Sequence, residues 1–180
     1  SKRFHFWINE ISPKTAPYSH KLNLKLTNNP FLEKLNKDKY FIYLRGINKE
    51  IEIFREENIP LFTEMEAKQQ EYGAISAKMT IDINGEQITM QKAALLLKDT
   101  DRDKREIIYN KILERRLQDE ESLDNLYDKL IIIRNQIAKN SGFENYRDYM
   151  FAAMGRFDYT VKDCFNFHDA IAQEIVPLIN

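Results

Sequence analysis

Apolar residues recur every three or four positions through most of this sequence, the spacing that gathers them on one face of an α-helix. Four stretches have this spacing, and their apolar positions are Tyr40, Leu44, Ile47, Ile51 and Phe54; Leu61, Met65, Tyr72, Ile75 and Met79; Ile108, Tyr109, Ile112, Leu113 and Leu117; and Leu123, Leu126, Leu130, Ile133 and Ile137. A last helix from Thr160 would carry Val161, Phe165, His168, Ala172, Ile175 and Ile179 on one face. The pattern predicts a mainly α-helical array.

Residues that commonly begin or end helices flank these stretches. The predicted helix starts are Asp38, the segment 99–101 (Asp-Thr-Asp), and Thr160 with Asp163 in a capping box. The predicted breaks are Pro60 between the first two helices, Gly142 after the fourth, and Pro177, which should kink the last helix or end it early. These signals separate the predicted helices from one another.

Residues 79–90 alternate between apolar and polar with period two instead, around the pair Asn84-Gly85. Asn-Gly is the preferred sequence for a type I′ turn between two antiparallel strands. A two-residue loop would pair Ile83 with Glu86, Ile81 with Ile88, Met79 with Met90, and Asp82 with Gln87. The isoleucine and methionine pairs then share one apolar face. The sequence therefore predicts one β-hairpin that packs its apolar face on helices.

Composition narrows the class of protein. The 180 residues are 43% hydrophobic, and 27 basic residues nearly balance 28 acidic ones. A net charge of -1 gives no electrostatic basis for binding nucleic acid or an anionic membrane. The single cysteine, Cys164, excludes an internal disulfide. Because no apolar run approaches the roughly 20 residues of a membrane span, and none of signal-peptide length follows the first residues, we expect a cytoplasmic protein.

Candidate reactive residues are few. The histidines are His5, His20 and His168, and none belongs to a His-Glu-x-x-His motif. Cys164 and His168 lie four residues apart on the last predicted helix, but two ligands make a poor metal site, and packing is the favoured interpretation. The pairs Glu56-Glu57 and Glu120-Glu121 are interpreted as solvated helix ends. We therefore predict no catalytic or metal-binding residue in this chain, and the sequence does not identify its substrate-binding residues. A nucleophile and base that meet only in the folded chain stay an open alternative.

Several short stretches together carry a family resemblance. In chain order they are 54–61 (Phe-Arg-Glu-Glu-Asn-Ile-Pro-Leu), the helix to Tyr72, the hairpin 79–90, 95–97 leading into 101–105, 134–138, 142–146 (Gly-Phe-Glu-Asn-Tyr), and 156–160 (Arg-Phe-Asp-Tyr-Thr). From about Lys49 onward the sequence resembles the oligoendopeptidase F branch of the thimet-oligopeptidase-like zinc metallopeptidases. Residues 1–48 are compatible with that family but less distinctive.

The resemblance implies a mostly helical enzyme with a deep channel that admits short peptides. In that family the zinc ligands are the two histidines of His-Glu-x-x-His and a later glutamate, and the glutamate of the motif activates the bound water. All of these lie downstream of the matched region, so no metal or catalytic residue carries over to this chain. The implied zinc is a cofactor of the parent enzyme and is not bound by this chain.

The resemblance also implies a division of the chain and its partners. Residues 1–93 would be an N-terminal helical region with the hairpin, and residues 94–180 the first helices of the peptidase region, truncated at the C-terminus. The expected partners are an oligopeptide substrate and the remaining C-terminal catalytic part. The apolar run 175–179, next to Asn180, would normally be covered, and it predicts self-association through the C-terminal helix.

Three functions are consistent with the sequence. The favoured one is a channel-wall segment of a zinc-dependent metalloendopeptidase, inactive on its own. The alternatives are a standalone helical interaction or peptide-binding module without catalysis, and a family relative that has lost its site and only binds peptides.

Overall fold

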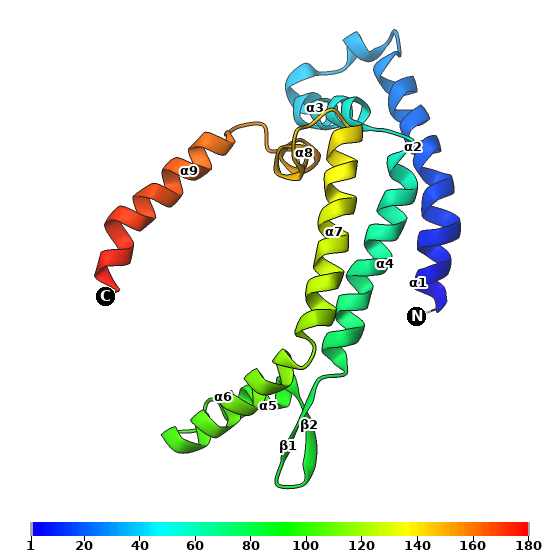
Figure 1. The fold of residues 1–180 in the computed structure, drawn as a ribbon. Helices are drawn as coiled ribbons and strands as arrows, with labels where there is room; N and C mark the ends of the chain where they lie inside the picture. The colour runs from blue at the N-terminus through cyan, green and yellow to red at the C-terminus, as the bar shows by residue number, and fades with distance from the viewer. Residues whose placement is uncertain (1, 180) are drawn as a thin grey trace. The chain divides into compact units, whose positions relative to one another are not determined.

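The computed structural model describes residues 2–179, and within them helices predominate beside one two-stranded antiparallel sheet (Figure 1). In chain order the elements are α1 (Lys2–Phe6), a π-helical turn η1 (Trp7–Ile11), α2 (Ser12–Thr27), a 3-10 turn η2 (Leu32–Lys34), α3 (Lys37–Ile53), α4 (Asn58–Ala77), β1 (Thr80–Ile83), β2 (Glu86–Thr89), α5 (Met90–Leu96), α6 (Arg102–Leu117), α7 (Glu120–Asn140), α8 (Tyr146–Ala153), α9 (Val161–Ala170), a π-helical turn η3 (Ile171–Ile175) and a 3-10 turn η4 (Val176–Leu178). The predicted fold class is confirmed.

The chain folds as two compact units. Unit 1 comprises Ser1–Thr63 and Arg134–Asn180, and unit 2 is Glu64–Ile133. The expected boundary after residue 93 falls inside unit 2, within α5. That boundary concerned the regions of a peptidase, and it stays a prediction. Ser1 and Asn180, the latter beside the predicted apolar run, lie outside the described residues.

The hairpin of unit 2 has the predicted register. Ile81 pairs with Ile88, Asp82 with Gln87, and Ile83 with Glu86. Asn84 and Gly85 both adopt positive φ, at 54° and 86°, as a type I′ turn requires. The ladder ends at the pair Thr80–Thr89, one step before the predicted Met79–Met90 pair. Thr89 caps α5 by accepting a hydrogen bond from the Lys92 amide, so Met90 begins a helix and does not extend the strand.

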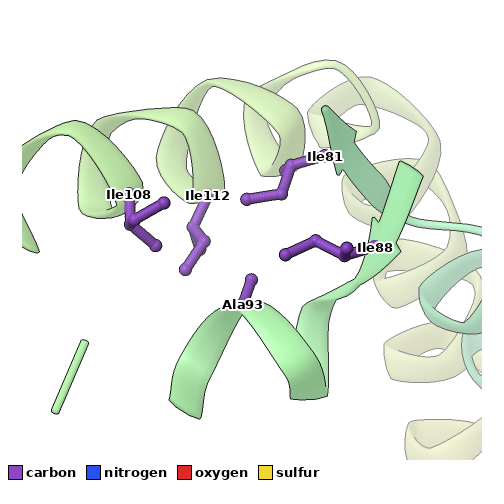
Figure 2. Packing of buried hydrophobic residues seen from close by; sticks show 5 residues of the cluster. All are labelled: Ile81, Ile88, Ala93, Ile108 and Ile112. Carbon is purple, nitrogen blue, oxygen red and sulfur yellow. The ribbon is translucent and has the colours of Figure 1, made fainter. Parts of the chain in front are cut away.

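The apolar face of the hairpin forms the core of unit 2 with α5 and α6. Ile81 and Ile88 from the strands, Ala93 from α5, and Ile108 and Ile112 from α6 point toward one another in Figure 2. Each of these five side chains is at most 8% exposed. The marginal stability of an isolated two-stranded ribbon is thus offset by burial of its isoleucines against helices.

Two of the predicted helix faces are narrower than the sequence pattern suggested. In α6 the residues Tyr109, Leu113 and Leu117 are exposed, because the helix buries only its Ile108–Ile112 stripe against the hairpin. In α4 the predicted face is wrong at Tyr72, which is 57% exposed. By contrast, α7 buries its predicted stripe at four of the five positions, namely Leu126, Leu130, Ile133 and Ile137.

Most predicted helix boundaries are confirmed. The Asp101 carboxylate accepts hydrogen bonds from the amides of Asp103 and Lys104 at the start of α6. Thr160 and Asp163 form the predicted capping box at the start of α9. Gly142 follows α7 with a φ of +86°, the left-handed conformation that glycine adopts at little cost. The α-helix α9 ends at Ala170, and irregular turns follow it as far as Pro177, which has no N–H to donate to a preceding carbonyl.

Two boundary predictions are wrong. Asn36, not Asp38, caps α3, since its side chain accepts the Lys39 amide while Asp38 already lies in the first turn. Pro60 does not separate α3 from α4; it lies in the first turn of α4, where its missing N–H would have had no helical partner. The break lies at residues 54–57, and Phe54 is the extended residue that ends α3.

Unit 1 has its own buried residues. Ile8, Ile137 and Ala138 are fully buried, and Ile47 and Tyr149 are nearly so. Thr63 donates a hydrogen bond from its hydroxyl to the Ile8 carbonyl at 3.1 Å, which joins α4 to the N-terminal turn η1. Among the described residues, no helix is both long and apolar enough to cross a membrane.

Replacing Ile88 by alanine should lower the free energy of unfolding by about 2–5 kcal/mol, because the cavity would lie between the hairpin and two helices. Ile132→Ala is the matched control, since its side chain is 68% exposed, and its effect should stay within about 0.5 kcal/mol. Urea unfolding followed by circular dichroism measures both. Equal losses in the two variants would contradict the packing in Figure 2.

Candidate functional site

The residues considered as metal ligands are dispersed. His5 lies exposed on α1, and His20 stacks on Phe54 with ring centroids 4.0 Å apart. His168 is exposed on α9, one turn after the half-buried Cys164. Within residues 2–179 no three histidine, cysteine, aspartate or glutamate side chains gather as they would around a metal ion. The Cys164–His168 pair therefore has no third ligand in the described part of the chain.

The two acidic pairs occupy helix starts, as predicted. Glu56 and Glu57 are exposed in the segment before α4, and Glu120 and Glu121 are exposed in the first turn of α7. Negative charge is favourable at the N-terminal end of a helix, where the backbone N–H groups point outward. These carboxylates have the solvated surroundings of surface charges.

The most buried polar group of unit 1 is Asn58, which is 1% exposed. Its amide nitrogen donates to the Ile137 carbonyl at 3.1 Å and to the Ser141 hydroxyl oxygen at 2.9 Å. Its amide oxygen accepts from Asn140 at 2.8 Å. The Ser141 hydroxyl in turn donates to the Ile53 carbonyl at 3.1 Å.

These three side chains, the Asn58 cluster (Asn58, Asn140, Ser141), connect the last residue of α3 and the first of α4 to the end of α7. These four hydrogen bonds join segments about 80 residues apart in sequence. A buried amide without partners is costly, so the cluster specifies how these helix ends meet.

The stretch 142–149 forms the corner that follows. Asn145 caps α8 by accepting the Asp148 amide at 3.0 Å, and it donates to the Asp148 carboxylate at 2.9 Å. The side-chain hydrogen bond from Arg147, and then the one from Asn145, lower the pKa of Asp148. Phe143 packs edge-on against Tyr149, whose burial raises its pKa. The residues that resemble the peptidase family here build a helix corner.

The stretch 156–160 has a second structural role. Arg45 of α3 donates from its two terminal nitrogens to the two carboxylate oxygens of Asp158, at 2.9 and 3.3 Å. The guanidinium group also lies over two aromatic rings, 4.4 Å from the centroid of Phe157 and 5.1 Å from that of Phe41. This Arg45 cluster (Arg45, Asp158, Phe41, Phe157) attaches the α8–α9 connection to α3.

The electrostatics of the Arg45 cluster are those of an ion pair at the surface. The hydrogen bonds from Arg45, and secondarily its positive charge, lower the pKa of the Asp158 carboxyl. The Asp158 side chain is 79% exposed, whereas that of Arg45 is 27% exposed. Exposed ion pairs contribute little free energy on their own, and the two ring contacts add cation–π attraction to the guanidinium.

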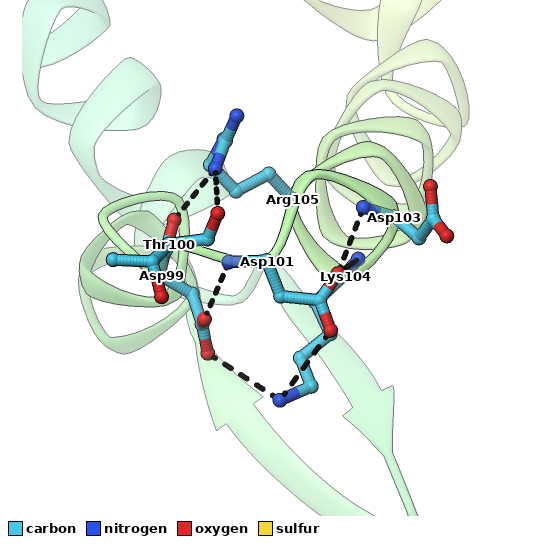
Figure 3. Close-up of polar contacts among 6 residues, drawn as sticks. All are labelled: Asp99, Thr100, Asp101, Asp103, Lys104 and Arg105. Carbon is cyan, nitrogen blue, oxygen red and sulfur yellow. Dashed lines mark hydrogen bonds and ion pairs between the residues drawn. The ribbon is translucent and has the colours of Figure 1, made fainter.

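The family-like residues 101–105 belong to a network over residues 99–105 at the start of α6 (Figure 3). Asp99 accepts the Asp101 amide at 2.9 Å, and this hydrogen bond is the main cause of its lowered pKa. Arg105 donates to the carbonyls of Asp99 and Thr100 at 2.8 and 3.0 Å. Lys104 lies 3.8 Å from Asp99 and 3.7 Å from Asp101. The charged side chains of this stretch are hydrogen-bond partners for backbone amide and carbonyl groups of the α5–α6 connection.

A hollow of about 640 Å³ runs along α3 in unit 1. Its lining residues on α3 follow one another at helical spacing, and they are Lys37, Phe41, Leu44, Arg45, Asn48, Lys49 and Glu52. Leu32, Glu33 and Phe157 complete it. We call it the α3 groove. Its volume lies in the range of pockets that hold small molecules, so it is the candidate binding site of unit 1.

Sequence reasoning missed the residues that organise this region. The sequence placed Asn58 and Asp158 in matching stretches without roles, and it gave no role at all to Arg45. The partners of Arg45 and Asn58 lie 113 and about 80 residues away. For Asn58 the sequence offered one signal, an asparagine and a proline at the start of an apolar helix. The same pair is also found where a helix simply begins, so it does not reveal a buried cluster.

Replacing Asn58 by alanine should lower the free energy of unfolding of unit 1 by about 1–3 kcal/mol, because buried donors and acceptors lose their partners. Asn48→Ala removes an exposed amide from the same unit and should be nearly neutral. Thermal and urea unfolding of the two variants measures the difference. An Asn58 variant as stable as the Asn48 variant would contradict the role of the Asn58 cluster.

The lowered pKa of Asp158 predicts a pH dependence. Its contribution to the free energy of unfolding is complete above the ordinary aspartate pKa of about 3.9, and it is lost as pH falls through the lowered folded value. The stability difference between the chain and Asp158→Asn should therefore be constant from neutral pH down to about 5, and shrink below about 4. In an Arg45→Ala background the difference should show much less of this pH dependence; an unchanged dependence would contradict the pairing.

The arrangement of helices in this chain is similar to that in part of several solved structures. Over 97% of its length the chain superposes with a TM-score of 0.88 on 32% of a Bacillus anthracis strain Ames chain that is provisionally assigned as oligoendopeptidase F, at 26% identity. A second chain with the same provisional assignment matches 98% of this chain with 31% of its own length, at a TM-score of 0.90 and 22% identity. PZ peptidase A, solved with an inhibitor, matches at a TM-score of 0.88 and 23% identity.

Sequence comparisons give less. No protein-family model and no curated protein matches the chain. The chain spans about a third of the length of the solved chains that it matches. The resemblance to oligoendopeptidase F seen in the sequence is thus confirmed as a similarity of fold over nearly the whole of this chain.

Proposed function

We propose that this chain forms part of the channel wall of a zinc-dependent oligopeptidase. The observation that carries the proposal is the fold match, which takes in 97–98% of this chain but 31–32% of each peptidase chain. A segment of a peptidase-length polypeptide would give such a match. The family-like stretches add support, because they are the residues that build the corners between helices in this structure.

The role of this chain in such an enzyme is architectural. A catalytic zinc needs three protein ligands and supplies an activated water that attacks the peptide bond. The described residues of this chain do not fit that ion, because they bring no such group of ligands together. Its own residues hold helices in fixed register: the Asn58 cluster joins α3, α4 and α7, and the Arg45 cluster joins α3 to the α8–α9 connection.

The proposal includes partners and a location. The substrate would be an oligopeptide, and the zinc ligands would come from polypeptide outside the matched third of a peptidase. The cytoplasmic location is compatible with the single cysteine, which cannot form an internal disulfide.

One observation favours a second candidate, a peptide-binding module without catalysis. The α3 groove combines apolar side chains, among them Phe41 and Leu44, with charged residues such as Lys37 and Glu33. A groove of this composition suits an extended or helical peptide, which would bind without being cleaved.

The test compares two proteins: this 180-residue chain, and the product of the whole open reading frame that encodes it. We expect the whole product to contain His-Glu-x-x-His, to bind about one zinc ion, and to cleave a quenched fluorescent oligopeptide until a chelator is added. The chain alone should bind no stoichiometric zinc after dialysis and release no fluorescence. Metal analysis and fluorimetry measure both properties.

Two results would contradict the proposal. One is a reading frame without the zinc motif, which would favour the peptide-binding module. The other is a 180-residue chain that by itself holds zinc near one equivalent and turns over peptide. Glu120→Gln, which alters an exposed carboxylate at a helix start, is the matched control and should leave the activity of the whole product unchanged.

A further inference from the structure

The turn of the hairpin, Asn84-Gly85, places an exposed asparagine side chain next to an unshielded backbone nitrogen. Both residues are exposed, and both adopt positive φ. Glycine has no Cβ, and nothing lies within 4 Å of the position that a Cβ of Gly85 would occupy. The Gly85 nitrogen is therefore open to solvent and to attack on the side chain of the residue before it.

An asparagine followed by glycine can lose its side-chain amide by an intramolecular reaction. The Gly85 nitrogen gives up its proton to solvent and attacks Cγ of Asn84, which forms a new C–N bond in a cyclic imide (succinimide). The Cγ–Nδ2 bond breaks, and Nδ2 takes up a proton and leaves as ammonia. Water then opens the ring at either carbonyl, which gives aspartate or isoaspartate at position 84.

Positive charge lies beside this turn. Asn84, Lys104, Lys111 and Asp99 are among the residues that line a hollow of about 300 Å³ in unit 2. Lys104 lies 3.8 Å from Asp99, whereas Lys111 donates from Nζ to the Asp82 carbonyl at 2.8 Å, which holds its ammonium group near the turn. A positive charge favours loss of the Gly85 proton and the oxyanion that forms on Asn84 during the attack.

One hydrogen bond opposes the reaction. The Gly85 N–H donates to Oδ1 of the Asp82 carboxylate at 3.1 Å. A hydrogen bond to the protonated form of a group favours that form, and a neighbouring negative charge disfavours a second one, so this contact keeps the Gly85 nitrogen protonated. We propose that Asn84 is a site of spontaneous deamidation, and that the Asp82 carboxylate slows the reaction by holding the Gly85 N–H.

Isoaspartate at position 84 would disrupt the hairpin. It routes the chain through the former side-chain carbon and so adds a backbone atom to a two-residue loop. A type I′ turn has a defined backbone geometry, and the register that it sets places Ile81 and Ile88 in the core of unit 2. Deamidation would therefore loosen that core. This inference is independent of the proposed function, which concerns a longer polypeptide.

The test begins with the unmodified, folded chain. After incubation in mildly alkaline buffer, peptide mass spectrometry measures the loss of amide at each asparagine. Asn84 should react at least about tenfold faster than Asn48, which is also exposed but is followed by a lysine. The isoaspartate form, separated by chromatography, should exchange the amides of β1 and β2 faster than the unmodified chain does, while the amides of α3 stay unchanged.

Variants then test the role of Asp82. In the folded chain, Asp82→Ala should raise the rate at Asn84 by at least about threefold; in denaturing urea, where the hydrogen bond is absent, the change should be less than about twofold. Thr80→Ala is the matched control, because it removes the cross-strand hydrogen bond from Thr80 to Gln87 and leaves the Asp82–Gly85 contact in place. It should change the rate by less than about twofold.

Four results would overturn the proposal or its consequence. Asn84 could react no faster than Asn48, or Asp82→Ala could leave the rate in the folded chain unchanged. Thr80→Ala could raise the rate as much as Asp82→Ala does, which would assign the effect to a loosened hairpin. An isoaspartate form with unchanged exchange in β1 and β2 would contradict the loss of the hairpin.

Discussion

The hydrogen bonds of the buried Asn58 side chain are the interaction on which the arrangement of unit 1 depends. One amide group satisfies the Ile137 carbonyl, the Ser141 hydroxyl and the Asn140 side chain at once. Through Ser141 the same network reaches the end of α3. A leucine or isoleucine in place of Asn58 would bury apolar surface but make no directional hydrogen bond. A fully paired amide, by contrast, fixes which helix ends meet. The helix corner at 142–149 comes directly after Ser141 in the chain. The α8–α9 connection, which Arg45 attaches to α3, comes after that corner.

The family-like stretches contain the residues that make these contacts between helices. The stretch 54–61 contains Asn58, the stretch 142–146 contains Gly142 and the Asn145 cap, and 156–160 contains Phe157 and Asp158. Each meets a demand of backbone or side-chain geometry in the structure. The fold match to the peptidase chains extends over 97–98% of this chain at 22–26% identity.

The sequence predicted those features that depend on residues close to one another along the chain. The hairpin register followed from two-residue alternation around Asn84-Gly85, and the capping box of α9 from residues three apart. The α3 cap was mistaken because Asn36 and Asp38 are both good capping residues, and only the extended backbone at Asn36 distinguishes them. The pairing of Arg45 with Asp158 spans 113 residues, and nothing local to either residue reports it. Tyr109 is exposed because α6 buries only its Ile108–Ile112 stripe, and a helical spacing does not specify how wide the buried face of a helix is.

Native-state hydrogen exchange of three amides tests the central role of Asn58 most directly. These amides are Asn58, Ser141 and Phe143, whose N–H groups bond to the carbonyls of Arg55, Ile137 and Ala138. If the Asn58 cluster holds unit 1 together, the three should exchange slowly, with a common free energy of opening close to that of unfolding unit 1, and Asn58→Ala should lower all three together. Fast exchange at Ser141 and Phe143, or a loss confined to Asn58 in the variant, would contradict this account.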